Sequence, residues 1–368
     1  MSAIGRKKIR ELRSFMEENS IDLVLIKDEA NARYFSSFFG ASVIAIDMTK
    51  RILFVSPIDF ERAEKQADVE EILNIKDFSN NYENAISKTF KGCKKVGIVK
   101  SSFSLSFFER LKKRLKASFV DLENFLIELR SVKLEEEISL IKKSCKITNF
   151  GISIIQELLE DIKGGRKISE KELAFILEKE LIERGAEKPS FETIVASGLR
   201  SFFPHPHPPS SNNLIKNYGM IDFGSVYKGY CSDVTVPFVI GCVKEKQRLI
   251  IEALKEAYKI ATYSVKINKP TWEVYKEVED FINSRGYELK HALGHGLGLT
   301  VHDYPSISPK PKDKIQLKEW KEVKFKEKMI FTIEPGIYSS NTGFRLENDF
   351  ILKKDGMKQI TNSFFLEI

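Results

Sequence analysis

The chain has 368 residues, of which 42% are hydrophobic and 30% charged, with a formal net charge of +7 at pH 7. Single hydrophobic cores usually stop growing near ~250–300 residues, so we expect two unequal domains. No segment approaches the ~18 consecutive apolar residues of a membrane span, and the lysines are scattered without a nucleic-acid-binding motif. We therefore expect neither a membrane nor a nucleic-acid partner.

The N-terminal segment and the cysteines bear on localisation. Residues 1–19 are charged throughout and predict an amphipathic helix, without the apolar middle of a signal peptide. The four cysteines form no CxxC pair, which argues against a disulfide framework and a cysteine zinc site. We expect a cytoplasmic protein with buried free thiols.

The first part of the chain alternates helix and strand. Ile9–Met16 has helical periodicity, and a second helix is expected over residues 104–117. The apolar runs predict strands at residues 21–26 and 94–100 and a hairpin formed by residues 42–47 and 51–56. These elements indicate an α/β domain over residues 1–125 that carries no catalytic constellation of its own.

From Lys133 the pattern changes to one long amphipathic helix that reaches Ile162. A second helix is expected to start at Ser169, with Glu172 three residues later in the pattern of a capping box. Strands and turns follow Gly185, and all the conspicuous polar residues lie in that part. We therefore expect a second domain over residues 126–368.

Two aspartates interrupt apolar strands in residues 218–241. This segment reads as two strands joined by a turn at Lys228–Gly229, with Asp222 on the first and Asp233 on the second. Burying a carboxylate in such a run costs several kcal/mol unless it is paired or bound to a metal. Each aspartate alone could cap a turn, but two that face each other across a hairpin favour a metal site.

All five histidines lie in about a quarter of the chain, and such clustering favours a metal or acid–base site. They are His205, His207, His291, His295 and His302. The glycines around His295 have the spacing GxGxG, which is not that of a phosphate-binding loop, and they argue against a helical HxxxH pair. A histidine on a strand between glycines is typical of a ligand that needs close backbone approach.

Two glutamates interrupt the last apolar strands, which we expect at residues 329–338 and 343–352. Glu334 lies in the first strand and Glu347 in the second, although Glu347 could instead form an ion pair with Arg345. Four carboxylates and one imidazole on antiparallel strands make an oxygen-rich site for two divalent ions. Two ions ~3.5–4 Å apart can share a hydroxide and stabilise a tetrahedral intermediate.

In order and approximate spacing, these motifs resemble the pita-bread metallopeptidases: methionine aminopeptidase, aminopeptidase P and prolidase. The matching segments are FETIVASG followed by PH at 204–205, MIDFG, GYCSD, HxxGHGLGLxVH, FTIEPGIY and GFRLEND. The segment NARYFSSFFG (31–40) resembles the creatinase-type domain that typical methionine aminopeptidases lack. The resemblance implies a creatinase-like α/β domain followed by an α+β pita-bread catalytic domain, and it favours the proline-specific branch.

The resemblance also implies a ligand set for two divalent ions, which could be Mn²⁺, Co²⁺, Zn²⁺ or Fe²⁺. Asp222 would bind one ion, and His295 and Glu334 the other. Asp233 and Glu347 would bridge the two ions.

Roles in catalysis are implied in the same way. Glu334 would move protons for the bridging hydroxide, while His205 and His302 would donate hydrogen bonds to the substrate and the tetrahedral intermediate. His291 and Arg345 would contact the substrate or orient a ligand. His207 matches no family position and reads as a loop residue.

The function that the resemblance implies is two-metal hydrolysis of the Xaa-Pro bond in dipeptides or short peptides, that is, a prolidase. The partner would be a small peptide with proline at its second position, and the enzyme would be a homodimer. The alternatives are an aminopeptidase P that acts on longer peptides and a metal-free creatinase-like hydrolase. The metal-free enzyme would be expected to have lost ligands, yet all of them are present here.

The chain departs from the family pattern at several places. Asp303 stands where the motif VHE usually has glutamate, and Asn348 stands where an acidic residue is common. The lysine-rich stretch 308–328 is longer than usual. We expect it to be a solvated insertion, although it could instead supply cations near the carboxylate of the substrate.

Overall fold

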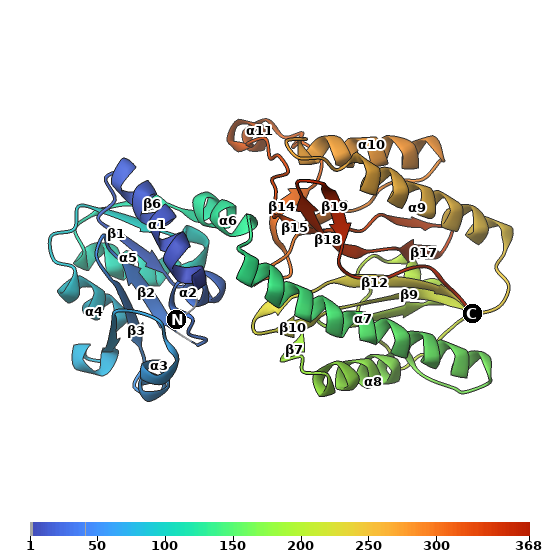
Figure 1. The fold of residues 1–368 in the computed structure, drawn as a ribbon, viewed down its shortest axis with the longest axis horizontal. Helices are drawn as coiled ribbons and strands as arrows, with labels where there is room; N and C mark the ends of the chain where they lie inside the picture. Colours follow the sequence, from blue (N-terminus) through green and yellow to red (C-terminus); the bar gives the residue numbers. More distant parts are fainter. Residues whose placement is uncertain (1–2, 41) are drawn as a thin grey trace. The chain divides into compact units, whose positions relative to one another are not determined.

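The computed structural model describes residues 3–40 and 42–368 (Figure 1). The chain divides into two units, Met1–Leu129 and Arg130–Ile368. The domain boundary expected between residues 125 and 126 stays a prediction; the division in the structure falls inside helix α6 (Glu123–Ser131). Among the described residues, no helix has the length and apolar character needed to cross a membrane.

Unit 1 contains a six-stranded mixed sheet in the order β4-β3-β2-β1-β5-β6. The strands are β1 (Leu23–Ile26), β2 (Ser42–Ile46), β3 (Arg51–Val55), β4 (Glu71–Asn74), β5 (Lys95–Ile98) and β6 (Ser118–Asp121). The predicted hairpin is present, with β2 antiparallel to β3. Strands β1, β2 and β3 are almost wholly apolar and fully buried, so both faces of the sheet are covered at these strands.

Helices surround this sheet, and two of them were predicted. They are α1 (Ala3–Glu18), α2 (Glu29–Ser36), α3 (Phe60–Gln66), α4 (Tyr82–Thr89), α5 (Leu105–Arg114) and α6, with short 3₁₀ segments η1 (Ile75–Phe78) and η2 (Lys100–Ser102). The predicted helices correspond to α1 and α5. Ser104 caps α5, since its side chain accepts a hydrogen bond from the backbone N–H of Phe107.

Unit 2 opens with the two helices that the sequence predicted, α7 (Glu135–Lys163) and α8 (Glu170–Glu183). One half of the expected capping box is present at α8, where Ser169 Oγ accepts from the backbone N–H of Glu172 at 3.1 Å. The later helices are α9 (Glu245–Ser264), α10 (Thr271–Ser284) and α11 (Lys314–Glu319), with the 3₁₀ segment η3 (Gly198–Phe202).

The strands of unit 2 form four sheets. Their orders are β20-β12-β9-β8, β11-β10-β7, β14-β13-β15-β18-β19 and the pair β16-β17. Their bounds are β7 (Lys188–Pro189), β8 (Ile194–Ser197), β9 (Tyr218–Phe223), β10 (Ser225–Tyr227), β11 (Tyr230–Cys231), β12 (Val234–Val239), β13 (Gly294–Gly296), β14 (Asp303–Ile307), β15 (Ile330–Ile333), β16 (Gly336–Ser339), β17 (Thr342–Arg345), β18 (Asn348–Lys353), β19 (Gly356–Gln359) and β20 (Leu366–Glu367).

The four-stranded and five-stranded sheets lie between two pairs of helices. In Figure 1, α7 and α8 (green) lie on one side of the strands of unit 2, and α9 and α10 (orange) lie on the other. One apolar core joins α7 and α8 to β9 and β12, and another joins α9 and α10 to β15 and β18. Each sheet therefore has one face on a helix pair, which leaves the space between the sheets for polar side chains.

Two predicted pairs of continuous strands, one in residues 218–241 and one formed by residues 329–338 and 343–352, are wrong in the same way. Residues 218–241 form four strands rather than two, and residues 329–338 and 343–352 each divide into two. In the last two segments, β15 pairs with β18 in the five-stranded sheet, and β16 pairs with β17 in a separate two-stranded sheet. Both segments therefore pass from one sheet to the other at the same point of their pairing. Pro335 has no N–H to donate to a continuing ladder, which accounts for the break on one side.

The cysteines are free, but the expectation that all are buried is wrong. Cys145 and Cys231 are buried, Cys93 is half-buried and Cys242 is exposed. Burial raises the pKa of the Cys145 thiol well above its ordinary value.

Candidate metal centre

The five candidate ligands lie at the adjoining ends of strands in two sheets. Asp222 is on β9 and Asp233 directly precedes β12 in the four-stranded sheet. His295 is on β13, Glu334 follows β15 and Glu347 precedes β18 in the five-stranded sheet. Each carboxylate therefore sits where a strand begins, ends or faces the other sheet.

The two aspartates are not directly opposite each other as the sequence suggested. Asp222 pairs with Thr235 in the antiparallel ladder between β9 and β12. Because side chains alternate along a strand, Thr235 and Asp233 project on the same face, and Asp222 lies diagonally from Asp233. A diagonal pair still lies within reach of one shared ion.

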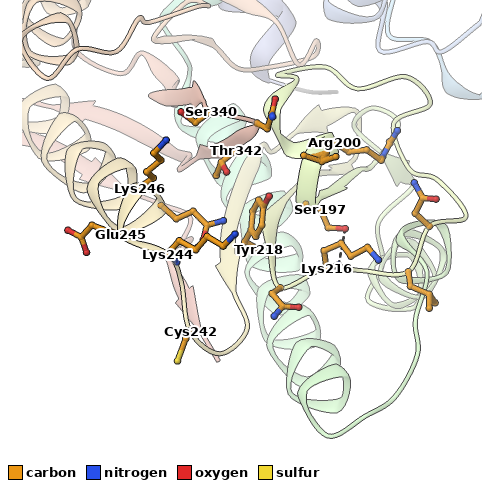
Figure 2. Close-up of a pocket in the computed structure, with 17 residues that line it drawn as sticks. Ser197, Arg200, Lys216, Tyr218, Cys242, Lys244, Glu245, Lys246, Ser340 and Thr342 are labelled. Carbon is orange, nitrogen blue, oxygen red and sulfur yellow. Dashed lines mark hydrogen bonds between the residues drawn. The ribbon is translucent and has the colours of Figure 1, made fainter.

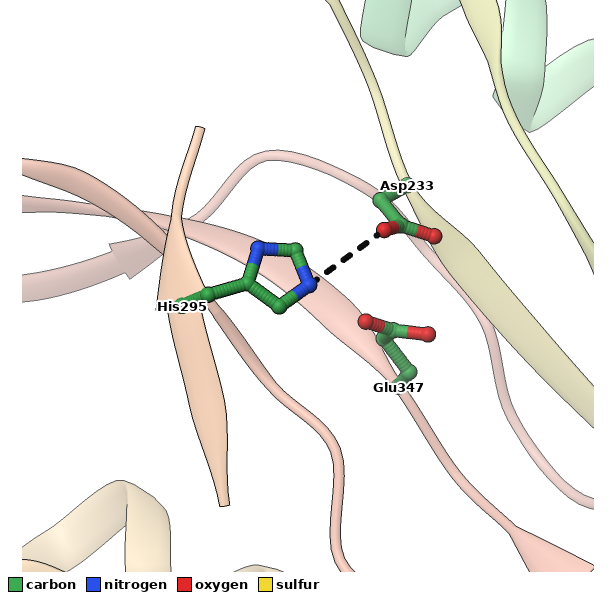
Figure 3. Close-up of side chains that lie close together, drawn as sticks. All are labelled: Asp233, His295 and Glu347. Atoms are coloured by element: carbon green, nitrogen blue, oxygen red, sulfur yellow. Dashed lines mark ion pairs between the residues drawn. The ribbon is translucent and has the colours of Figure 1, made fainter. Parts of the chain in front are cut away.

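Three of the ligands form a group that could hold a metal ion. One ligand atom from each of Asp233, His295 and Glu347 lies within 4.8 Å of the others. Figure 3 shows the imidazole pointing towards the two carboxylates, with His295 Nε2 3.6 Å from Asp233 Oδ2. Glu334 joins this group, since its Oε1 lies 3.5 Å from the same Nε2.

The strand around His295 explains why glycines flank it. A Cβ at Gly294 would lie 2.1 Å from the carbonyl oxygen of Thr332, and one at Gly296 would lie 2.1 Å from that of Tyr304. His295 Nδ1 is 3.1 Å from the carbonyl of Gly296 and donates to it. This hydrogen bond places the proton on Nδ1 and leaves the Nε2 lone pair facing the carboxylates.

A buried arginine connects the carboxylates. Arg345 donates from Nη2 to Asp222 Oδ2, from Nε to Thr235 Oγ1 at 2.9 Å and from Nη1 to the Tyr338 hydroxyl at 3.0 Å. Thr235 Oγ1 in turn donates to Glu347 Oε2 at 2.7 Å. The alternative in which Glu347 is the ion-pair partner of Arg345 is therefore wrong: the ion pair is formed with Asp222.

The carboxylates retain oxygens with no hydrogen-bond partner. Within the described part of the chain, Asp222 Oδ1, Asp233 Oδ1 and Glu347 Oε1 are buried and unpartnered. Burial and the neighbouring carboxylates raise the pKa values of Asp233 and Glu347 well above their ordinary range. Burial raises the pKa of Glu334 to about 8, against the opposing effect of a nearby guanidinium. These side chains fit divalent cations, which would occupy the free oxygens and remove the repulsion.

The histidines implied to act on substrate are arranged around this cluster. The ring of His302 lies edge-on to that of His295, with centroids 4.4 Å apart. His205 is an exposed loop residue whose pKa is lowered by partial burial and then by Arg345. His291 is more enclosed: its Nδ1 lies 2.8 Å from the carbonyl of Ala292 and its Nε2 3.1 Å from the hydroxyl of Tyr338.

Sequence reasoning missed three polar residues of this region. Tyr338 and Thr235 link Arg345 to the rest of the network, and Asp349 lies behind Asp233, whose backbone N–H donates to Asp349 Oδ2 at 3.0 Å. Thr235 follows Asp233 by two residues, and Asp349 follows Glu347 by two. The two-residue period of a strand was therefore a usable signal for both.

A cavity lies elsewhere in unit 2. Its volume is about 1130 Å³. The residues that line it include Ser197, Lys216, Tyr218 and Lys244, which Figure 2 labels. It contains none of the five candidate ligands. Tyr218 begins β9, whereas Asp222 lies near the other end of that strand, so this cavity and the metal centre are separate features.

Comparison with known proteins agrees with this geometry. Residues 139–354 match the model of metallopeptidase family M24, and residues 8–132 match that of the Creatinase/Prolidase N-terminal domain. A Xaa-Pro dipeptidase from Pyrococcus horikoshii is 33% identical over 366 residues, which is 98% of each chain.

Solved structures are similar over nearly the whole chain. The prolidase from Pyrococcus horikoshii OT3 aligns with a TM-score of 0.85 and 32% identity, covering 98% of this chain and 99% of that one. An X-Pro aminopeptidase from Thermotoga maritima aligns with a TM-score of 0.84 and 29% identity, covering 97% and 99%. The expected fold class is confirmed, and the chain belongs to metallopeptidase family M24, with a Creatinase/Prolidase N-terminal domain ahead of its pita-bread catalytic domain.

Proposed function

We propose that this metallopeptidase is a two-metal Xaa-Pro dipeptidase that hydrolyses the bond before proline in dipeptides and short peptides. The observation that carries the proposal is the buried group formed by Asp233, His295 and Glu347, whose ligand atoms lie within 4.8 Å of one another. Full-length relatives named Xaa-Pro dipeptidase and prolidase support the choice of substrate.

The ligand assignment is part of the proposal. Two divalent ions, drawn from Mn²⁺, Co²⁺, Zn²⁺ and Fe²⁺, would be held by Asp222, Asp233, His295, Glu334 and Glu347. Unpartnered oxygens on three of these carboxylates support it. When bound, the ions would activate a water molecule and polarise the scissile carbonyl.

Glu334 is proposed to carry the proton. Its Oε1 lies 3.5 Å from His295 Nε2, and burial raises its pKa to about 8. Bound cations would ionise this carboxyl, so that it could accept a proton from the attacking water and return it later. The nitrogen of the departing proline needs that proton, since it leaves as an amine.

The remaining polar residues divide by exposure. His205 and His302 are exposed to solvent and are proposed to donate hydrogen bonds to the substrate and to the tetrahedral intermediate. Arg345 and His291 use their nitrogens on protein partners, among them the hydroxyl of Tyr338. We therefore propose that these two residues orient the carboxylates and the pocket wall rather than contact the substrate directly.

We also propose a homodimer located in the cytoplasm. The location carries over from the sequence expectation above, whereas the family resemblance is the basis for the dimer. Exposed apolar side chains support the dimer: Leu199 and Phe203, near His205, are 68% and 55% exposed. Sedimentation velocity of the purified protein tests the assembly, and a single species with the mass of one chain would contradict it.

Substrate preference tests the main proposal. Apoprotein is refilled with Mn²⁺ or Co²⁺, and kcat/KM is measured for Met-Pro, Met-Ala and Met-Pro-Gly-Gly. We expect Met-Pro to be the best substrate, because the site must accept a tertiary amide that has no N–H. Equal cleavage of Met-Ala would contradict the proline specificity.

A second candidate, aminopeptidase P, is favoured by the similarity to the Thermotoga maritima X-Pro aminopeptidase. In the same experiment, faster cleavage of Met-Pro-Gly-Gly than of Met-Pro would assign that function instead. Undiminished activity in metal-free protein would indicate the creatinase-like alternative.

A further inference from the structure

A second group of buried charges lies next to His302. The side chains of Arg130, Lys133 and Asp303 are 7%, 1% and 1% exposed. Arg130 Nη2 donates to Asp303 Oδ1 at 2.8 Å, and Lys133 Nζ lies 3.7 Å from Asp303 Oδ2. We refer to these three residues as the Asp303 cluster.

The two cations of the Asp303 cluster stabilise its single carboxylate. Burial alone would raise the pKa of Asp303, but Lys133 and Arg130 outweigh it and hold that pKa below its ordinary value. Lys133 Nζ also donates to the carbonyl of Arg130 at 2.7 Å. Buried charges are costly to desolvate, and a group of three with directed contacts restricts where the attached backbone can lie. The Asp303 cluster lies outside the set of candidate metal ligands, so it needs an explanation of its own.

The position of Asp303 in the chain supplies that explanation. Asp303 opens β14, directly follows His302 and pairs with Gly296 of β13, the neighbour of His295. The loop between them, residues 297–302, carries the His302 ring. One end of this loop is thus attached to a metal-ligand strand and the other end to the Asp303 cluster.

The cluster also packs against the loop itself. A Cβ at Gly298 would lie 2.7 Å from Asp303 Oδ2 and 3.0 Å from Lys133 Nζ. Inside the loop, Gly298 N–H donates to the carbonyl of Thr300 at 3.1 Å, and Thr300 Oγ1 donates to the carbonyl of His302 at 3.0 Å. The charged side chains therefore contact the backbone of the segment whose conformation sets the direction of the His302 imidazole.

The segment that carries the two cations, Arg130 and Lys133, is held by contacts that do not involve Asp303. Lys133 N–H donates to the carbonyl of Lys328 at 3.0 Å, and Val132 forms a β-bridge with Met329, next to β15. The segment 130–133 is thus tied to the five-stranded sheet that carries His295. The ion pairs from this anchored segment to Asp303 therefore restrict the position of the loop that Asp303 ends.

We propose that Arg130, Lys133 and Asp303 position the His302 imidazole for the hydrogen bond that it donates to the tetrahedral intermediate. This inference rests on the proposed function, because it assumes the role given there to His302. The three are positioning residues: they act through the loop and do not touch the substrate.

Asp303→Asn tests the proposal with the least change of shape. We expect kcat for Met-Pro to fall by about 10–100-fold, the usual cost of losing a residue that orients a catalytic group, with metal affinity unchanged. Asp303→Glu keeps the charge and should recover part of the loss. An Asp303→Asn enzyme with wild-type kcat would overturn the proposal.

A double-mutant cycle separates positioning from a general structural role. His302→Ala alone should cost about 10²–10³-fold in kcat, as for one oxyanion donor. If Asp303 acts through His302, adding Asp303→Asn to His302→Ala should cause little further loss. A loss in the double variant equal to the product of the single losses would reject the proposal.

A readout other than activity keeps the inference testable if Xaa-Pro peptides are not cleaved. In protein labelled with ¹³C-histidine, Asp303→Asn should shift the ring resonances of His302 and leave those of His207 unchanged. A shift in a protein that is inactive on Xaa-Pro substrates would support the positioning role and reject the proposed function. Unchanged His302 resonances would reject the positioning role.

A matched control and a reserve variant complete the design. Arg51 in unit 1 is also 7% exposed and pairs with Glu70 at 2.7 Å. Arg51→Met should lower stability without altering kcat or the His302 resonances, whereas Arg130→Met should alter both. If Asp303→Asn does not fold, Lys133→Met keeps the ion pair of Arg130 and Asp303 and permits the same measurements.

Discussion

Two kinds of buried carboxylate lie in unit 2, and they differ in their hydrogen-bond donors rather than in their burial. Glu170 is fully buried, and both of its oxygens are used. Oε1 accepts from Ser197 N–H at 2.8 Å and from its hydroxyl at 3.0 Å. Oε2 accepts from Arg200 Nε at 2.8 Å and from the hydroxyl of Ser211 at 2.6 Å.

The carboxylates of the metal centre have no such set of donors. Asp233 and Glu347 are buried to a similar degree, yet each has an oxygen without a hydrogen-bond partner among the described residues. A carboxylate with enough donors stabilises the fold as it stands, whereas one with free oxygens and like charges nearby requires a cation or a proton. The comparison predicts opposite responses to metal removal, mutation and pH.

Metal removal should have the largest effect. Chelation should abolish hydrolysis of Met-Pro, and Mn²⁺ or Co²⁺ should restore it. Arg345 pairs with Asp222, and the described residues provide no such ion pair for the other carboxylates of the centre. Bound metal should also raise the unfolding temperature. At a metal concentration a hundredfold above Kd, binding to the native state adds about 2.7 kcal/mol to the free energy of unfolding. Full activity in rigorously metal-free protein would contradict the metal assignment.

Substitution of the proposed proton carrier should have the next largest effect. Glu334→Gln should lower kcat by about 10²–10⁴-fold, the range for loss of a general acid–base group. Stopped-flow or steady-state kinetics on Met-Pro provide the measurement. Glu183→Gln changes an exposed glutamate of α8 and serves as the control. Wild-type kcat in Glu334→Gln would remove this residue from the mechanism.

Neutralising one carboxylate of each kind should change stability in opposite directions. Glu170→Gln should destabilise the protein by about 1.5–3 kcal/mol, since it removes hydrogen bonds to a charged group. In chelated protein, Asp233→Asn should instead be neutral or stabilising, because it removes like-charge repulsion. Denaturant midpoints with and without Mn²⁺ measure both effects. A metal-free Asp233→Asn protein less stable than Glu170→Gln would invalidate the comparison.

The dependence of stability on pH should be the smallest of these effects. Burial raises the pKa of Glu334 from 4.5 to about 8, so its contribution to stability is present at low pH and is lost as the pH rises through 8. Burial lowers the pKa of His295 from 6.5 to about 4, so its contribution is lost as the pH falls below 6.5. Between pH 6.5 and 8 the carboxyl groups with raised pKa values dominate the slope.

The free energy of unfolding of chelated protein should therefore fall by about 1–2 kcal/mol between pH 6.5 and pH 8. A native state that binds one proton more than the unfolded state loses about 1.4 kcal/mol for each pH unit. Metal-loaded protein should show a flatter profile, because its carboxylates are already ionised. Urea midpoints at intervals across the range provide the measurement. Identical profiles with and without metal would show that Glu334 is not perturbed as the structure indicates.

Local patterns were enough to nominate the residues of the candidate metal centre. Asp222, Asp233, Glu334 and Glu347 each interrupt an apolar strand, where an isolated charge is costly, and His295 lies between glycines that leave no room for a Cβ. These signals are local because they depend only on neighbours in the chain. They needed no knowledge of which strands pair.

Other parts of the centre depend on pairing between distant strands. The ion pair of Arg345 with Asp222 and the diagonal placement of Asp222 and Asp233 follow from sheet register. The strand breaks at Glu334 and Glu347 arise because both segments leave the five-stranded sheet there and form the separate pair β16–β17. An apolar run in the sequence does not show which sheet each half of it joins.

The sequence by itself determined the α/β class of the first domain, the long helix α7 and the set of candidate metal ligands, since periodicity and charges within apolar runs are properties of short segments. Only the tertiary structure decided which buried carboxylates receive donors and which keep free oxygens. It also brought Arg130 and Lys133 to Asp303, far along the chain. The physical reason is that hydrogen bonding and desolvation depend on the atoms that folding brings within a few ångströms, and segments distant in the sequence supply most of those atoms.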